Sequence, residues 1–229
     1  MHVLLVYAHP EPTSFTAALK DTAYEAIQNA GHSVEVSDLY AEGFNPVAGR
    51  HDFLTVQDAQ RFHYQNEQGY AHEHGGFAPD IAREQARFAK ADLVIWLYPL
   101  WWGGVPAILK GWFDRVLAYG FAYSDGRRYD SGFFHDKRGL LCLSTGGTQQ
   151  RFSADGVYGT IEQVLWPTQR LMVEYMGIKA LEPFVAYGAP RVDQAGREAY
   201  LTAWRTRVRD ALSEPVAAAK DEPKTAPVP

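Results

Sequence analysis

The sequence predicts a doubly wound α/β protein with a five-stranded parallel sheet in the order 2-1-3-4-5, numbered along the chain. Strand-length apolar runs alternate with helical stretches, and several runs are apolar throughout, as expected of parallel strands covered on both faces. Each of the main runs is followed by a loop rich in Gly, Pro or hydroxyl side chains. Ligands of such sheets bind beyond the carboxyl ends of the strands, so the loops after strands one, three and four should converge.

The predicted elements form one domain over residues 1–212. The five strands are expected at residues 3–7, 34–36, 93–97, 139–144 and 180–187. The helices are expected at about 15–30, with Thr13 or Ser14 as N-cap, at 80–89, with Asp80 as cap, and at 106–117, 160–176 and 195–212. Residues 41–79 lack periodicity but hold many aromatics, which favours a packed excursion over a free loop. The tail 213–229 has no apolar anchors and is expected to be disordered.

Composition excludes several classes of function. With 229 residues, 46% hydrophobic and 21% charged, the chain is typical of a globular protein, and its net charge of −5 argues mildly against nucleic acid and anionic membranes. No apolar run is long enough for a membrane span or a signal peptide, so the cytoplasm is the expected location. The single cysteine, Cys142, lies in an apolar run and is expected to be a buried, inert thiol. We expect no metal site, because His72 and His74 have no third ligand at a recognised spacing.

The stretch from residue 93 to 121 reads as strand, loop and helix. Its loop brings two indoles, Trp101 and Trp102, beside two glycines, Gly103 and Gly104, at the carboxyl end of a buried strand. Flat aromatic walls next to bare backbone suit a flat aromatic ligand better than a phosphate or a sugar.

Two further loops are expected to meet this one. Residues 9–16 lack the glycine fingerprint of dinucleotide folds but put hydroxyls at a helix N-terminus, which is either an anion site or a plain helix cap. Residues 144–148 contain Gly146 and Gly147, which allow close approach of a ligand or simply form a tight turn. Convergence of the three loops favours the functional interpretation of each.

The motifs in these loops resemble one enzyme family. They include AHPEPTSF (8–15), PDIAREQ (79–85), GVPAILKGWFDRV (104–116) and STGG (144–147). With shorter matches between them they cover about residues 3 to 210. This pattern is similar to the NAD(P)H:quinone oxidoreductase family, the DT-diaphorase group of flavodoxin-like flavoproteins.

The resemblance implies FAD, or alternatively FMN, reduced by NAD(P)H and reoxidised by a quinone. By position, four residues would hold the pyrophosphate and ribityl side of the flavin: His9, Ser14, Phe15 and Thr16. The isoalloxazine would be flanked by Pro99, Leu100, Trp102, Thr145, Gly146 and Gly147, with Trp101 and Gly103 in the same loop. His63 matches a glutamine near the cofactor in FAD-binding members. The resemblance also implies a homodimer with the active site at the subunit interface, to which Tyr123 and Tyr175 of the second subunit contribute, and which buries segments carrying Phe121 and Trp112.

The substrate side departs from the family pattern. Gly103 replaces a phenylalanine and Asp125 a tyrosine, while Phe152 and Tyr158 match a tyrosine–histidine pair that assists hydride transfer. We therefore expect Tyr158, with the N–H groups of Gly146 and Gly147, to stabilise charge at the flavin. Arg151 could add a positive charge if it turns inward, or be a solvated surface residue. The expected substrate contacts are Trp102, Tyr123, Asp125, Arg151 and Tyr175.

The predicted function is two-electron reduction of quinones by NADH or NADPH in a ping-pong mechanism. Two alternatives stay open at this point. One is an azo or nitro reductase of the same fold, since reduced flavin is not selective by itself. The other is an ancillary flavoprotein that regulates a potassium efflux system, which the rebuilt substrate side also permits.

Overall fold

The computed structural model describes residues 1–215. Its parallel sheet has the order β2-β1-β3-β4-β5, with β6 also paired to β4. The strands are β1 (His2–Tyr7), β2 (Ser33–Asp38), β3 (Leu93–Pro99), β4 (Arg138–Ser144), β5 (Lys179–Ala180) and β6 (Phe184–Ala186). The predicted fold class and strand order are confirmed.

The predicted fifth strand, 180–187, is not continuous. It is split into β5, which pairs with the start of β4, and β6, which pairs with its end. Pro183 lies in the gap, and a proline cannot donate to a strand ladder because it has no N–H. The edge of the sheet is therefore interrupted at that point.

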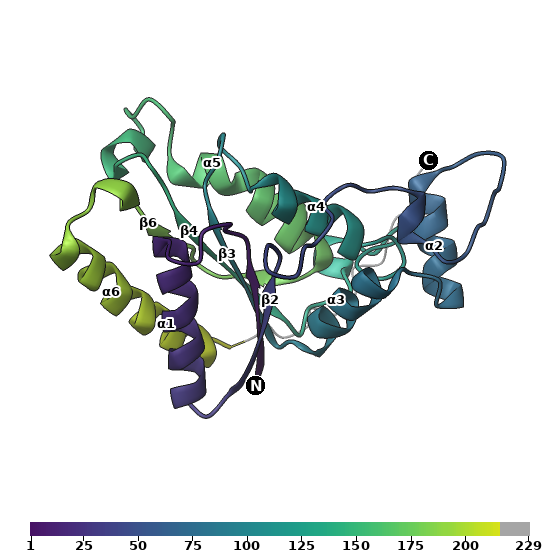
Figure 1. Ribbon diagram of the computed structural model, residues 1–229, viewed down its shortest axis with the longest axis horizontal. Helices are drawn as coiled ribbons and strands as arrows, with labels where there is room; N and C mark the ends of the chain where they lie inside the picture. Colours follow the sequence, from purple (N-terminus) through teal and green to yellow (C-terminus); the bar gives the residue numbers. More distant parts are fainter. Residues whose placement is uncertain (216–229) are drawn as a thin grey trace.

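Helices cover both faces of the sheet (Figure 1). They are α1 (Phe15–Asn29), α2 (Tyr64–His74), α3 (Pro79–Lys90), α4 (Ala107–Val116), α5 (Ile161–Thr168) and α6 (Gln194–Ser213). Helices α1 and α6 lie on one face, and α3, α4 and α5 on the other. Helix α6 runs one residue into the predicted tail, of which residues 216–229 lie outside the described part of the chain.

Two helix predictions need correction. Helix α3 begins at Pro79 with Ala78 as its N-cap, so Asp80 lies in the first turn and does not cap the helix. The helix expected over 160–176 ends as an α-helix at Thr168 and continues as a π turn, Gln169–Val173, and a 3-10 turn, Glu174–Met176. Pro167 lacks an N–H and crowds the preceding turn, which accounts for the irregular continuation.

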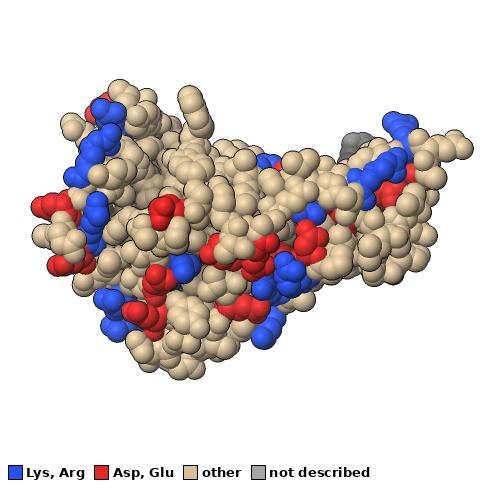
Figure 2. Space-filling model, in the orientation of Figure 1, with Lys and Arg blue, Asp and Glu red and all other residues tan. Residues whose placement is uncertain are grey.

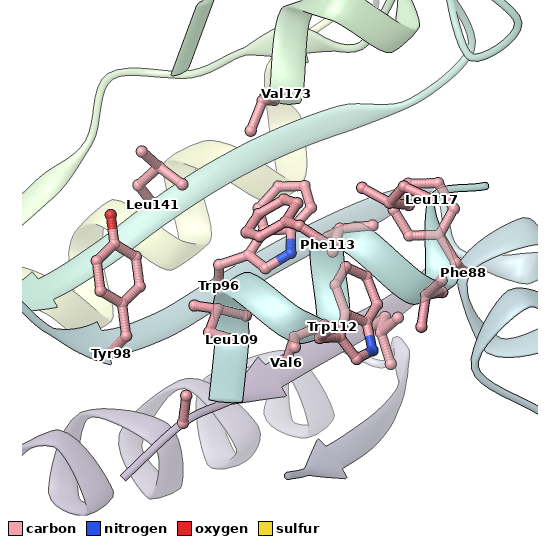
Figure 3. Close-up of a cluster of buried hydrophobic side chains, with 14 of the residues drawn as sticks. Val6, Phe88, Trp96, Tyr98, Leu109, Trp112, Phe113, Leu117, Leu141 and Val173 are labelled. Carbon is pink, nitrogen blue, oxygen red and sulfur yellow. The ribbon is translucent and has the colours of Figure 1, made fainter. Parts of the chain in front are cut away.

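The core forms two layers because strand side chains alternate between the faces of the sheet. In β3, Leu93, Ile95 and Leu97 pack toward α1 and α6, while Val94, Trp96 and Tyr98 pack toward α4. Figure 3 shows this second layer, in which the ring of Trp96 stacks on Phe113 at a centroid distance of 5.7 Å. Cys142 is fully buried, and burial raises the pKa of its thiol, as expected of an inert cysteine.

Trp112 belongs to this core, so its own side chain is not an interface anchor, and the place of its segment in a subunit interface stays a prediction. Its side chain is completely buried within one chain, and its Nε1 donates to a carboxylate oxygen of Glu84 at 2.8 Å. Leu109, Trp112 and Val116 share the inward face of α4, as their helical spacing requires.

The 41–79 excursion contains helix α2, which the sequence pattern does not predict, and a small aromatic cluster. The ring of Phe53 lies 5.4 Å from Tyr64, 6.2 Å from Phe62 and 6.2 Å from Phe77. Because both ends of the segment meet in this cluster, the excursion folds back on itself beside α4.

A buried ion pair fastens the excursion to α4. The guanidinium of Arg115 lies 2.7 Å from a carboxylate oxygen of Asp52, and both side chains are almost fully buried. Tyr64 donates to the other oxygen of Asp52 at 2.6 Å, and Arg115 also donates to the backbone oxygen of Asn45. Arg115 also pairs with Asp80 at 3.0 Å, so the more costly loss is that of Arg115, which would take the guanidinium partner from the fully buried Asp52.

We expect Arg115→Met to lower the free energy of unfolding by about 3–5 kcal/mol, because it leaves Asp52 buried without a counter-charge. The matched control is Lys110→Met on the same helix, which removes the exposed pair with Asp114 and should cost less than about 1 kcal/mol. Urea unfolding monitored by circular dichroism measures both values. Equal losses in the two variants would contradict this role of the buried pair.

Candidate functional site

A cavity of about 510 Å³ lies at the carboxyl ends of β1, β3 and β4. The three predicted loops converge there, around the N-terminus of α1 in the upper left of Figure 1. The lining residues are His9, Thr13, Ser14, Phe15, Thr16, Pro99, Leu100, Trp101, Ser144, Thr145, Gly146, Ala189, Pro190 and Arg197. Nine of them were predicted as cofactor-binding residues.

The first wall of the cavity is the N-terminus of α1. Ser14 is the N-cap, and its hydroxyl oxygen accepts the N–H of Ala17 at 3.1 Å. The N–H groups of Phe15 and Thr16 open the helix, where no intrahelical acceptor exists. Free N–H groups and a helix dipole suit an anion, and the Ser14 cap holds these two N–H groups in place. The helix cap is confirmed, and the anion site stays a prediction.

His9 adds a neutral donor to this wall. Its Nδ1 accepts the N–H of Glu11 at 3.0 Å, which assigns the proton of the neutral ring to Nε2. Burial lowers the pKa of His9 below its ordinary value, so the neutral form prevails near pH 7. The ring of Trp101 lies 6.2 Å from the imidazole and borders the same cavity.

The second wall is a tight turn at residues 101–104. Trp101 and Gly104 exchange two backbone hydrogen bonds of 3.0 and 3.1 Å. Trp102 and Gly103 have φ values of 51° and 72°, as the two central residues of a type I′ turn require. Left-handed backbone costs a non-glycine residue roughly 1–2 kcal/mol, yet Trp102 adopts it and its indole is fully exposed at the tip. The strain therefore places a flat aromatic surface beside the cavity.

The third wall is the turn after β4. A Cβ at Gly147 would lie 2.8 Å from the ring of Phe152 and 3.1 Å from that of Tyr158, so only glycine fits there. These two rings pack at a centroid distance of 5.0 Å. Arg151 lies 3.3 Å from the Tyr158 oxygen and donates to it, which leaves the phenolic O–H free to donate to a ligand.

Six predicted residues belong to the turns that border the cavity but do not line it: Trp102, Gly103, Gly147, Arg151, Phe152 and Tyr158. Four others lie away from it. His63, Tyr123 and Tyr175 line a different groove of about 760 Å³ between α2, α4 and the irregular end of α5. Asp125 lies on an exposed hairpin, where its carboxylate pairs with Arg128 at 3.2 Å. Within one chain, most of the predicted cofactor residues therefore lie at the cavity, while most of the predicted substrate residues lie elsewhere.

Arg197 is the main lining residue that the sequence motifs do not identify. It follows the N-cap Asp193 in the first turn of α6, and it brings a positive charge to the cavity. Figure 2 shows Lys and Arg side chains along the left edge of the molecule, where α6 begins. A cation in the first turn is disfavoured by the helix dipole, and this anomaly is the signal that could have identified it.

Two negative findings apply to residues 1–215. No group of three or more His, Cys, Asp or Glu side chains could hold a metal ion there. None of the helices in the same range combines the length and apolar character needed to cross a membrane. The side chain of His74 instead stacks on Tyr70, at a centroid distance of 4.1 Å.

Comparison with known proteins defines the class. A family model of the flavodoxin-like fold matches residues 1–208. Rat NAD(P)H dehydrogenase [quinone] 1 is 42% identical over 212 residues, which are 92% of this chain and 77% of the rat protein. Mouse ribosyldihydronicotinamide dehydrogenase [quinone] is 41% identical over 213 residues, covering 93% and 92%.

Solved structures agree with this assignment. A crystal structure from Klebsiella pneumoniae, described as that of a quinone reductase, superposes with a TM-score of 0.89 at 37% identity, covering 93% of this chain and 85% of the other. The NAD(P)H:quinone oxidoreductase of Methanothermobacter marburgensis superposes with a TM-score of 0.73 at 29% identity, covering 93% and 98%. The chain belongs to the NAD(P)H dehydrogenase (quinone) family of flavodoxin-like enzymes.

Proposed function

We propose that the protein is a cytoplasmic flavin-dependent oxidoreductase that uses NADH or NADPH to reduce quinones by two electrons in a ping-pong mechanism. The observation that carries this proposal is the cavity at the strand ends, whose donors are grouped at two sides. The Nε2–H of His9, the α1 N-terminus and Arg197 suit a pyrophosphate. Backbone N–H groups of Gly146 and Gly147, with the hydroxyl of Tyr158, suit the polar edge of a flat heterocycle.

The walls between these groups fit the rest of a flavin. Pro99, Leu100 and Trp101 offer an apolar surface, and Trp102 extends it out of the cavity. When bound, the flavin would supply hydride transfer between nicotinamide and quinone. The chain's own residues then bind, orient and donate hydrogen bonds. In the proposed ping-pong mechanism nicotinamide and quinone use the same place on the flavin, so the oxidised nicotinamide leaves before the quinone binds.

We propose FAD in preference to FMN. The 41–79 excursion resembles that of the FAD-binding members, and it presents His63 on the groove described above. The Nδ1 of His63 accepts the N–H of Asn66 at 3.3 Å and caps α2, which fixes the orientation of its ring. An imidazole ring with a fixed orientation is better suited to contact an adenine than a side chain that changes its rotamer.

The proposed activity has a direct test. Purified protein should be yellow, and the cofactor released by heat should be FAD on chromatography. Initial rates with NADPH and menadione should give parallel double-reciprocal lines with turnover in the ordinary enzymatic range. Intersecting lines would overturn the shared-site mechanism. Turnover with azo or nitro compounds but not with menadione would support the alternative reductase, and flavin binding without any turnover would support a regulatory role.

We also propose a homodimer in which the groove of one subunit faces the cavity of the other. The groove contains Tyr123 and Tyr175, whose rings lie 5.5 Å apart, and it is bordered by exposed apolar side chains such as Leu171. Tyr and aliphatic side chains are suited to be interface anchors. This arrangement would bring the predicted cofactor residues of one subunit next to Tyr123 and Tyr175 of the other.

Sedimentation should therefore give about twice the monomer mass of 25.6 kDa. Leu171→Glu, which puts a charge in the groove, should shift the protein toward monomer and lower its activity. Arg209→Glu on α6, which covers the opposite face of the sheet, is the matched control and should stay dimeric. A wild-type monomer with bound flavin and full activity would refute the dimer.

Tyr158→Phe should slow reduction of the flavin by NADPH by roughly 10- to 1,000-fold, because it removes one donor to the charge that develops in the transition state. Flavin binding should be nearly unchanged. Because Tyr158 stands at the position of a histidine, the wild-type rate should lack the inflection between pH 5 and 8 that a histidine there would impose.

Stopped-flow absorbance measures this rate. Tyr24→Phe is the control, since its phenol oxygen contacts only Gln28 on α1, away from the cavity. Reduction of Tyr158→Phe at the wild-type rate would make Tyr158 a packing residue.

A further inference from the structure

We infer that Arg191 is a positioning residue that holds the Gly146–Gly147 peptide so that its N–H remains available to the ligand of the cavity. This inference rests on the flavin function proposed above. Arg191 precedes α6 in a 3-10 turn, Ala189–Arg191, and its guanidinium donates to the carbonyl oxygen of Gly146. Arg191 was not among the predicted site residues.

The carbonyl groups of the turn after β4 are all engaged by the protein. The oxygen of Thr145 accepts the N–H of Ala189 at 3.0 Å. The oxygen of Gly147 accepts the N–H of Gly188 at 2.8 Å and the hydroxyl of Thr145 at 2.7 Å. The oxygen of Gly146 has the guanidinium of Arg191 as its partner within residues 1–215. The carbonyl oxygens of this turn thus point toward the segment that follows β6.

The amide hydrogens of the same turn are unpaired. Within the described chain, the N–H groups of Gly146 and Gly147 have no acceptor. In a trans peptide the C=O and the N–H point in opposite directions. Because Arg191 binds the Gly146 oxygen, the Gly147 N–H faces away from Arg191 and is left for a ligand.

The Gly146–Gly147 pair needs a hydrogen bond from outside the turn to fix its peptide. Glycine has no Cβ and rotates readily about φ and ψ, so the 146–147 peptide could otherwise flip and present its oxygen instead. The other two peptides of the turn are held by backbone hydrogen bonds, but the Gly146 carbonyl depends on a side chain. Arg191 is well placed to hold it, because its own N–H is fixed to the oxygen of Gly188 at 2.8 Å and the preceding Pro190 restricts the backbone.

The functional consequence is electrostatic. Donors aimed in advance at a place where negative charge develops stabilise that charge without reorganisation. The pyrimidine edge of a flavin gains negative charge on reduction. A peptide locked with its N–H toward this edge favours the reduced form, and a peptide free to turn its oxygen there disfavours it.

The test is the midpoint potential of the bound flavin, measured in the holoprotein against a redox dye of known potential. In Arg191→Ala the equilibrium constant for two-electron reduction should fall about tenfold, which corresponds to a potential about 30 mV lower. Arg191→Lys, which keeps a charged donor, should recover most of the loss. Circular dichroism checks that the variants are folded.

The control separates positioning from a general effect of charge. Arg209→Ala removes the same charge from the exposed surface of α6, twelve residues or roughly 18 Å along the helix from Arg197, and should leave the potential unchanged. All measurements are repeated in 1 M salt, where a remote surface charge is screened within about 3 Å. A loss that vanishes in salt, or that equals the control, would overturn the positioning role. Absence of flavin from the wild-type protein would instead refute the proposed function.

Discussion

The site depends first on the parallel register of β1, β3 and β4. Pairing of Pro99 with Ser144 ends β3 and β4 at one level, and pairing of Tyr7 with Leu97 ends β1 two residues before them. Backbone bonds then tie their loops together, since Ala8 donates to the oxygen of Leu97 at 2.9 Å and Leu100 to that of Ser144 at 2.8 Å. A slip of one residue in any pair would turn a wall of the cavity to the other face of the sheet. The core on both faces holds this register, because every strand side chain there has a fixed place in one of two packed layers.

On this frame the site residues rely on backbone geometry more than on side-chain charge. Two walls offer N–H groups, the start of α1 and the turn at Gly146–Gly147, and the turn at Trp101–Gly104 offers an indole on a backbone closed by its own hydrogen bonds. Each of these segments is held in a different way. Ser14 caps the start of α1, the turn at Trp101–Gly104 closes with its own backbone hydrogen bonds, and Arg191 donates to the carbonyl oxygen of Gly146 in the turn after β4. The strain at Trp102 has no packing explanation, because the side chain contacts solvent. Such strain persists where the surrounding structure enforces it, and here it serves to expose the indole.

Much of this arrangement could be predicted from the sequence, because its signals are local. Strand, loop and capped helix follow one another within residues 3–16, so His9 and Ser14 could be placed without tertiary information. Arg191 and Arg197 could not, since their approach to the cavity depends on how α6 packs across the sheet. Helix α2 was missed because its polar composition gives no apolar stripe, and its stability comes from contacts with the excursion. Trp112 shows that helical spacing assigns a single side chain to the core even where a family resemblance places its segment near a subunit interface.

The departures from the family pattern are concentrated where charge on the flavin would be controlled. A histidine can supply one donor and, when protonated, one positive charge. We propose that three residues of this chain share that role. Tyr158 provides a hydroxyl donor, Arg151 donates to the phenol oxygen and adds positive charge, and Arg191 fixes the neighbouring peptide. None of the three is a histidine, the side chain whose ordinary charge change falls between pH 5 and 8. The role of one histidine would thus be divided among a phenol, a peptide N–H and two guanidinium groups, and the electrostatics of the site would depend on two exposed arginines that no local motif connects.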